Sequence, residues 1–145
     1  MIKVFISQPM HGLSDDEIKV ERDRVVDKFR SALGVQYPNV DNEVEVVNII
    51  NPTNAPKNAS RLWYLTEAIR TIEIADVIIF MRGWDKASGC RVERAVVENY
   101  QSMFADRLIL TEGVTGWYYI GKEAMKRLGI SPSDVPIDGG ALAWT

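Results

Sequence analysis

The chain has 145 residues and a net charge of −3, because 20 Asp and Glu outnumber 17 Lys and Arg, and its sequence pI is near 5.2. This length predicts one domain over residues 1–145, and the acidic balance argues against a protein that binds nucleic acid by neutralising its phosphates. The longest apolar runs are far shorter than the roughly 20 residues that span a bilayer, so the sequence predicts no membrane partner.

Cysteine and histidine are nearly absent. Cys90 is the only cysteine and His11 is the only histidine. One cysteine forms neither an internal disulfide nor a zinc cluster, so the composition favours a reducing, cytoplasmic location and no metal site. The single histidine also weakens any scheme in which a serine or cysteine nucleophile is paired with histidine.

The first strand and helix are clear in the pattern. Residues 2–7 form a near-continuous apolar run, typical of a strand that helices cover on both faces. The strand is expected to end before Pro9, because proline has no backbone amide to donate to a neighbouring strand. Ser14 and Glu17 have the spacing of a capping box, which predicts a helix that ends at Gly34. The expected core residues of this helix are Ile18, Val25, Val26, Phe29 and Leu33.

Strands and helices then alternate. Their β-branched and apolar residues predict strands at residues 44–50, 77–81 and 107–111. A helix capped by Ser60 is expected to run to about residue 75, and another to run from about residue 90 to residue 103. The expected core residues are Leu62, Leu65, Ile69 and Ile72 in the first of these helices, and Val92, Val96 and Tyr100 in the second.

Beyond residue 112 the pattern is weaker. Residues 117–120 favour a strand, residues 122–128 favour a short helix stopped by Gly129, and residues 131–145 favour an extended segment with two prolines and a glycine pair. The whole chain predicts a single α/β domain with a doubly wound, flavodoxin- or Rossmann-like sheet of four to five mainly parallel strands.

We expect a core at residues 1–112 and a C-terminal extension at residues 113–145. The extension is a candidate for a subunit interface because it holds two of the four tryptophans, Trp117 and Trp144.

In such sheets, ligands bind outside the carboxyl ends of the strands. The loops to consider are therefore residues 7–12, 51–56 and 82–89. The candidate substrate-binding residues in these loops are Ser7, Gln8, Met10, His11, Asn51, Gly83, Trp84, Asp85, Ser88 and Gly89.

Glu93 is the candidate catalytic residue. It is expected in the first turn of the helix after the third strand, where unpaired amides favour an exposed carboxylate by about 0.3–1 kcal/mol. Such a carboxylate can act as a nucleophile, or it can only complement the helix dipole, as many first-turn glutamates do. Cys90 is expected to pack the helix on the sheet, since no second cysteine and no nearby histidine supports it as a nucleophile. Asp76 is at the opposite end of the central strand, which favours a structural role.

Several loop residues have two interpretations. Ser88 and Gly89 either cap the helix or let its amides approach a phosphate or a sugar hydroxyl. Trp84 either stacks on a base or covers the core. His11 either donates a hydrogen bond to a ligand or is a solvated loop residue.

Two segments together resemble a known family. Residues 5–10, FISQPM, end the first strand, and residues 75–93, ADVIIFMRGWDKASGCRVE, cover the central strand, its loop and the start of the next helix. Over roughly residues 1–100 the chain is similar to the nucleoside 2-deoxyribosyltransferase-like proteins, especially a small uncharacterised branch common in phages and prophages. The residues that carry this resemblance are Gln8-Pro9-Met10-His11-Gly12, Gly83-Trp84, Ser88-Gly89 and Glu93.

The resemblance implies a reaction for Glu93. In the characterised transferases the corresponding glutamate attacks C1′ of a nucleoside, the base leaves, and a second base or water resolves the glycosyl ester, as in retaining glycosidases. The resemblance therefore implies an N-glycosidic transferase or hydrolase that acts on a nucleoside or nucleotide without a metal or an organic cofactor. It also implies Ser7 and Ser88 as candidates for phosphate binding, a homo-oligomer as the assembly, and the host cytoplasm as the location if the protein is encoded by a phage.

Position 68 departs from the family pattern. Active relatives carry an aspartate about two turns before the position that matches Asp76, and this chain has Ala68 there. The nearest carboxylate is Glu67, about 100° around the helix. Either Glu67 protonates the leaving base, which makes it the second catalytic candidate, or that acid is missing.

Two alternatives to this reaction remain open. If the acid is missing, the protein is a non-catalytic one that binds a nucleotide or a nucleotide-derived signal. A lower alternative is an NAD-cleaving enzyme, because the Toll/interleukin-receptor NADases also use a glutamate on a flavodoxin-like sheet.

Overall fold

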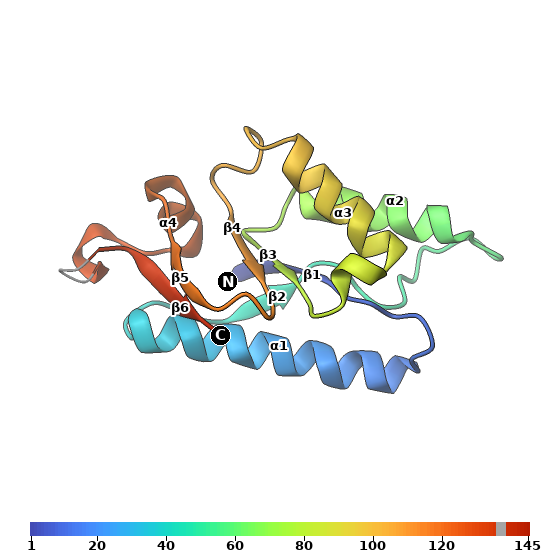
Figure 1. Ribbon diagram of the computed structural model, residues 1–145, viewed down its shortest axis with the longest axis horizontal. Helices are drawn as coiled ribbons and strands as arrows, with labels where there is room; N and C mark the ends of the chain where they lie inside the picture. The colour runs from blue at the N-terminus through green and yellow to red at the C-terminus, as the bar shows by residue number, and fades with distance from the viewer. Residues whose placement is uncertain (136–138) are drawn as a thin grey trace.

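The computed structural model describes residues 1–135 and 139–145 (Figure 1). Four parallel strands form the central sheet in the order β2-β1-β3-β4: β1 (Ile2–Ser7), β2 (Val44–Val46), β3 (Val77–Phe80) and β4 (Leu108–Thr111). The predicted single α/β domain with a flavodoxin- or Rossmann-like sheet is confirmed. Because the chain passes from β1 to β2 on one side and then to β3 on the other, the topological switch point lies between β1 and β3.

Helices cover both faces of this sheet (Figure 1). α1 (Asp15–Gln36) packs on one face, and α2 (Arg61–Ile72) and α3 (Ser88–Asn99) pack on the other. Along β1, Val4 and Ile6 belong to the core on the α1 side, whereas Phe5 belongs to the core on the side of α2 and α3. This alternation directs Ser7 to the same side as Phe5. Among the described residues, no helix is long and apolar enough to cross a membrane.

β2 is shorter than the predicted strand at residues 44–50. It ends at Val46 because the side chain of Asn48 takes over the pairing with β1. The amide of Asn48 donates to the Ile6 carbonyl at 2.7 Å, and its oxygen accepts from the Ile6 amide at 3.0 Å. A side chain that satisfies both backbone groups of one residue competes with the regular ladder and ends it.

Helix ends also differ from the prediction. α1 begins at the predicted capping box but continues through Gly34 to Gln36, because Gly34 does not have the positive φ with which a glycine ends a helix. α2 ends at Ile72 rather than near residue 75. α3 spans Ser88–Asn99 instead of residues 90–103, and the Asn99 side chain donates to the Ala95 carbonyl at 2.7 Å at its end.

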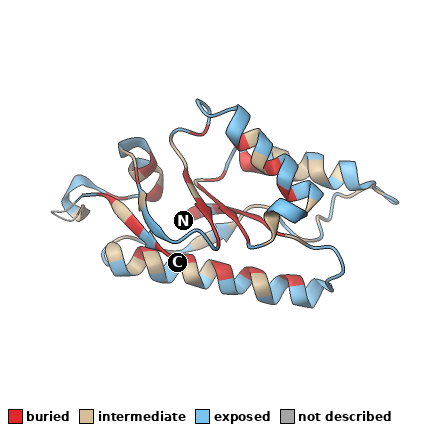
Figure 2. Cartoon of the chain, in the orientation of Figure 1, coloured by how far each residue is buried: buried red, intermediate tan, exposed pale blue. Residues whose placement is uncertain are grey.

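Two predicted core stripes are partly wrong. Figure 2 shows that the helices have buried residues on one side and exposed residues on the other. In α3, Val92 and Tyr100 are 40% and 61% exposed, and the buried residues are Cys90, Glu93 and Val97. One residue corresponds to about 100° of helix rotation, so α3 turns Glu93 to the sheet in place of Val92. In α2, Leu62 is 72% exposed, Leu65 and Ile69 are half-buried, and Ile72 is buried.

The residues after β4 form a smaller unit beside the sheet. β5 (Gly116–Tyr119) pairs antiparallel with β6 (Ala141–Trp144), and α4 (Lys122–Leu128) lies between them in sequence. The strand predicted at residues 117–120 therefore exists but does not join the parallel sheet, and the tail predicted to be extended contains β6. Gly129 ends α4 as predicted, with φ +75°. Residues 136–138 of that tail lie outside the described residues.

Two short 3₁₀ helices complete the fold. They are η1 (Trp84–Lys86), in the loop after β3, and η2 (Pro132–Asp134), after α4. β6 lies along α1 (Figure 1), where Leu142 and Trp144 are buried in the α1 core. The Trp144 indole donates to the Thr111 carbonyl at 3.1 Å, so this tryptophan holds the extension to the end of β4.

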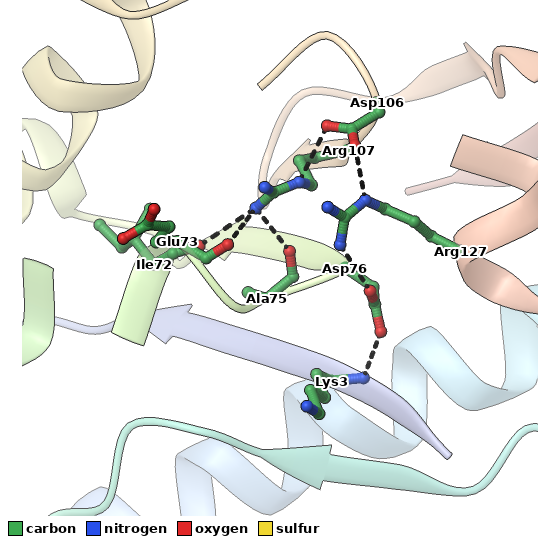
Figure 3. A network of polar contacts seen from close by, with 8 residues as sticks. All are labelled: Lys3, Ile72, Glu73, Ala75, Asp76, Asp106, Arg107 and Arg127. Atoms are coloured by element: carbon green, nitrogen blue, oxygen red, sulfur yellow. Dashed lines mark hydrogen bonds and ion pairs between the residues drawn. The ribbon is translucent and has the colours of Figure 1, made fainter. Parts of the chain in front are cut away.

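A polar network at the amino edge of the sheet connects α4 with the strands (Figure 3). Asp76 accepts from the Lys3 amide at 2.9 Å and from Arg127 at 3.1 Å. Asp106 joins Arg127 to Arg107, with N–O distances of 2.8 and 2.9 Å. Asp76 therefore lies in a network that ties β1, β3 and α4 together, which agrees with the structural role predicted for it.

Arg107 caps the C-terminal end of α2. Its Nη1 donates to the carbonyls of Ile72, Glu73 and Ala75 at 3.4, 2.7 and 2.9 Å (Figure 3). These carbonyls lie at or just beyond the helix end, where intrahelical donors are missing. The cap explains why α2 stops before the predicted residue.

Replacing Arg107 with lysine should lower the free energy of unfolding by about 1–3 kcal/mol, because a single ammonium cannot bond both the carbonyls at the end of α2 and Asp106, which the guanidinium reaches through Nη1 and Nε. Urea denaturation followed by circular dichroism measures the loss. Arg70→Lys, in the same region but with a side chain 74% exposed, is the control and should change stability by less than about 0.5 kcal/mol. Equal losses in the two variants would contradict the capping role.

Candidate functional site

A buried pair of polar side chains lies at the carboxyl edge of the sheet. Ser7 ends β1 and is fully buried, and Glu93 of α3 is 7% exposed. The Ser7 hydroxyl donates to Oε1 of Glu93 at 2.8 Å. Because Ser7 ends β1 and α3 follows β3, this pair lies at the switch point of the sheet, where folds of this class bind ligands.

The helix dipole is not what sets the charge of Glu93. Since α3 begins at Ser88, Glu93 is in the second turn rather than in the predicted first turn, and the dipole effect falls off beyond the first turn. Burial raises the pKa of the Glu93 carboxyl from 4.5 to about 7, against the opposing effects of the Ser7 hydrogen bond and the Arg22 charge. Glu93 therefore changes its protonation state near neutral pH.

Arg22 is a member of the site that the sequence prediction missed. It lies on α1 and is 6% exposed, and its Nε donates to Oε1 of Gln8 at 3.1 Å. Its Nη1 donates to the Asn48 carbonyl, and Gln8 in turn donates to the Ile18 carbonyl at 2.9 Å. Burial lowers the pKa of Arg22 and Glu93 raises it, but a guanidinium remains charged.

The sequence did contain a signal for Arg22. It stands four residues after Ile18 and seven before Phe29, within the apolar stripe of its helix. A charged residue in such a stripe is buried only when it is paired. Asn48 has the same kind of signal, because it interrupts a run of β-branched residues.

Cys90 lies one turn before Glu93 on the same face of α3 and is also buried. Burial raises the pKa of its thiol to about 11, and the nearby Glu93 charge acts in the same direction. The thiol therefore stays protonated near neutral pH, in keeping with the packing role expected for it.

The loops that carry the two sequence motifs touch each other. Gly83 has φ +88°, and a Cβ built on it would lie 3.6 Å from Cγ of Pro9. Trp84 is half-buried, and its ring meets Phe80 edge-on with the ring centroids 5.9 Å apart. The guanidinium of Arg94 lies 5.0 Å from the Trp84 ring. Trp84 thus packs over the core in this structure.

The other predicted binding residues lie on the surface. The Asn51 side chain donates to Asp15 at 2.8 Å, at the start of α1. The Ser88 hydroxyl accepts from Arg91 at 3.5 Å. The exposed members of the predicted set are Met10, His11, Asn51, Asp85, Ser88 and Gly89. The structure therefore brings together Ser7, Gln8 and Glu93, with Arg22 and Asn48 beside them.

The second carboxylate candidate has a partner on its own helix. Glu67 forms an ion pair with Arg70, with an N–O distance of 3.7 Å and a Glu67 side chain that is 29% exposed. Ala68 packs against the core cluster that contains Phe5 and Val97. Position 68 thus faces inward, and position 67 lies beside it on the half-exposed flank of α2.

Two cavities lie away from the Ser7 and Glu93 pair. One, of about 200 Å³, lies between α3 and β4, and the other, of about 340 Å³, lies between α1 and the β5–β6 sheet. Neither is lined by Ser7 or Glu93. The buried polar pair is the candidate site, because a buried carboxyl with a raised pKa is a stronger sign of chemistry than the size of a cavity. In the part of the chain that the structure describes, no cluster of His, Cys, Asp and Glu is arranged to hold a metal ion.

Comparison with known proteins found one family. A family model described as a domain of unknown function (DUF4406) matches residues 2–104. No match was found among curated proteins or among solved structures. The matched segment contains Ser7, Gln8, Arg22, Asn48 and Glu93, whereas β4, β5 and β6 lie beyond it.

Replacing Glu93 with glutamine should stabilise the protein at pH 8 and leave its stability at pH 4 nearly unchanged. Folding raises the pKa of Glu93 from 4.5 to about 7, so the folded state binds this proton more tightly than the unfolded state does. The unfolding free energy of the wild type therefore falls as pH rises between those values, by at most on the order of 3 kcal/mol. Denaturant unfolding of both proteins from pH 4 to pH 9 measures the difference.

The control for this experiment is Glu98→Gln. Glu98 lies on the same helix with a side chain that is 57% exposed, so its replacement should leave the pH profile parallel to that of the wild type. If the Glu93→Gln profile is also parallel to the wild type, Glu93 does not have the raised pKa.

Proposed function

Because the chain belongs to the family described as a domain of unknown function (DUF4406), a description that names no activity, we propose its function from the site. The proposed activity is cleavage or exchange at the N-glycosidic bond of a nucleoside or nucleotide, with Glu93 as the nucleophile. The observation that carries the proposal is the hydrogen bond from Ser7 to the buried Glu93 carboxyl, 2.8 Å long, at the switch point. The similarity of the two motifs to nucleoside 2-deoxyribosyltransferase-like proteins supports the same reaction.

The proposed reaction is a double displacement. An oxygen of the ionised Glu93 attacks C1′ of the sugar, the bond from C1′ to the base nitrogen breaks, and the base takes the bonding electrons and a proton. A water molecule or a second base then attacks C1′ and releases the Glu93 carboxylate. Water makes the protein a hydrolase, and a base makes it a transferase.

Ser7 of β1 and Arg22 of α1 both support this role of Glu93. The Ser7 hydroxyl holds one carboxylate oxygen, which orients the other toward the reacting carbon. The charge of Arg22 favours the ionised carboxylate. Since attack needs the ionised form and the pKa of Glu93 is about 7, kcat/KM should rise with pH through the neutral range.

Access to Glu93 requires movement of the covering loops. Ser7 is fully buried and Glu93 is 7% exposed, so a sugar does not reach the carboxyl in the conformation described here. Pro9 and Gly83 place the two motif loops in contact near this edge. In our proposal these loops separate when the substrate binds, as in many enzymes that exclude water from a reacting centre.

The proposed reaction should release free base from one member of a panel of deoxynucleosides, nucleoside monophosphates and NAD, as detected by chromatography. Glu93→Gln should lower the rate at least about a thousandfold, because it removes the nucleophile. Ser7→Ala should lower the rate roughly tenfold, because it removes one hydrogen bond to a charged group. Glu98→Gln is the control and should keep the wild-type rate.

If the wild type and Glu93→Gln give the same traces, the catalytic proposal is wrong. Glu67→Gln tests the source of the proton on the leaving base. A loss of about a hundredfold or more assigns that proton to Glu67, and an unchanged rate assigns it to solvent. The NAD sample in the panel tests the NAD-cleaving alternative.

A second candidate function is binding without turnover. Two observations favour it: Ala68, which has no acidic group, occupies the inward position of α2, and Glu67 lies beside it on the flank of the helix, paired with Arg70.

A binding protein should be stabilised by about 2.7 kcal/mol at a ligand concentration of 100 times Kd. It should also return the ligand unchanged. A thermal-shift screen with the same panel, followed by chromatography of the ligand, checks both outcomes. Stabilisation together with released base would contradict the binding-only function.

A further inference from the structure

The outer face of the β5–β6 sheet is apolar and exposed. Trp117 and Tyr119 are 68% and 79% exposed, and their cross-strand neighbours are Ala143 and Ala141. The opposite face of the sheet belongs to the core, where Leu142 and Trp144 are buried. Of the two tryptophans that suggested an interface, Trp144 therefore packs in the core of the chain, whereas Trp117 remains exposed.

This face continues toward α1. Trp117 and Ala143 also line the cavity of about 340 Å³ between the β5–β6 sheet and α1, together with Ala32 and Val35. Val35 is 83% exposed. Lys28, Ser31 and Gln36 of α1 line the same cavity, so the exposed apolar residues have a polar border, as at many interaction sites.

β5 also has an unpaired backbone edge. The Ile120 amide donates to the Gly140 carbonyl at 2.9 Å. In an antiparallel pair the direction of these groups alternates, so the amide and carbonyl of Tyr118 point to β6, and those of Trp117 and Tyr119 point away from it. Among the described residues, no strand pairs with that outer edge. β5 has the sequence GWYY, with neither the charges nor the proline that usually protect an edge strand from pairing.

The chain exposes more surface than a compact monomer of its mass. The chain exposes 8640 Å², whereas a compact monomer of 16.4 kDa is expected to expose about 7,500 Å². This excess of about 1,100 Å² belongs to the whole chain, and it is larger than the roughly 800 Å² that each partner buries in a standard interface. A second copy of the chain suits this face because it brings the same unpaired β5 edge and the same aromatic residues.

We propose that β5 pairs antiparallel with β5 of a second copy, about a two-fold axis at Tyr118, and so forms a four-stranded sheet in the order β6-β5-β5-β6. In this register Trp117 of one copy lies opposite Tyr119 of the other, and all the outward backbone groups of both residues are paired. The aromatic side chains then pack as cross-strand pairs on one face. The contact is self-complementary, as a two-fold interface requires.

The pairing is tested first by replacing an outward amide. Analytical ultracentrifugation over a series of protein concentrations should show a wild-type dimer. Tyr119→Pro removes an amide that does not bond to β6, so the β5–β6 pairing is kept and the dimer should dissociate at least tenfold more readily. Trp117→Lys, which places a charge in the contact, should have the same effect. Tyr100→Lys is the control, since Tyr100 is 61% exposed at the end of α3, and it should remain dimeric.

Amide exchange tests the register without any variant. In the wild type, the amides of Trp117 and Tyr119 should exchange more slowly as the protein concentration rises, whereas the Tyr118 amide should be protected at every concentration. A monomeric wild type at all concentrations overturns the proposal. So does a dimer that Tyr119→Pro and Trp117→Lys leave equally tight, or one in which the Trp117 and Tyr119 amides exchange at a constant rate.

Discussion

The burial of the Glu93 carboxyl is the constraint around which the carboxyl edge of the sheet is built. A charge removed from water is costly unless hydrogen bonds and an opposite charge replace the lost hydration. Here β1 supplies Ser7 and α1 supplies Arg22. Arg22 is itself held by Gln8 and by the carbonyl of Asn48. Three separate segments of the chain are therefore fixed around one carboxyl, and the early end of β2 at Val46, two residues before Asn48, follows from the same arrangement.

A second buried carboxylate at the same edge shows why Glu93 is different. Glu112, 6% exposed, follows β4 and accepts two hydrogen bonds from Arg24, at 2.7 and 3.2 Å, and one from the Arg82 amide. These partners outweigh burial and lower the pKa of Glu112, whereas burial raises the pKa of Glu93. Carboxyls whose surroundings move their pKa values in opposite directions usually have different roles. Glu112 is held ionised as a structural anchor for α1, and Glu93 is the one whose charge changes near neutral pH.

The features that the sequence predicted are those with local causes. The capping box at Ser14 and Glu17, the stop at Gly129 and the apolar strands depend on residues a few positions apart. The errors depend on distant partners: the end of α2 on Arg107, the end of β2 on Ile6, and the position of β5 on β6. Within the candidate site, the strand-end motifs indicated Ser7, Gln8 and Glu93, but Arg22 is on the opposite helix layer, and only its place in an apolar stripe hinted at it.

The most informative error concerns the rotation of α3. Val92 and Val96 lie on one apolar face of the helix, and full burial of a valine stabilises the folded state by about 1.5–3 kcal/mol. The helix leaves Val92 40% exposed and turns Glu93 inward instead. Cys90 and Val97 recover part of the apolar burial on that face, but the raised pKa of Glu93 means that its partners do not fully offset the loss of hydration. Natural sequences break local rules of this kind mainly at functional sites. The rotation of α3, which the apolar pattern did not predict, therefore supports the proposal that Glu93 has a chemical role.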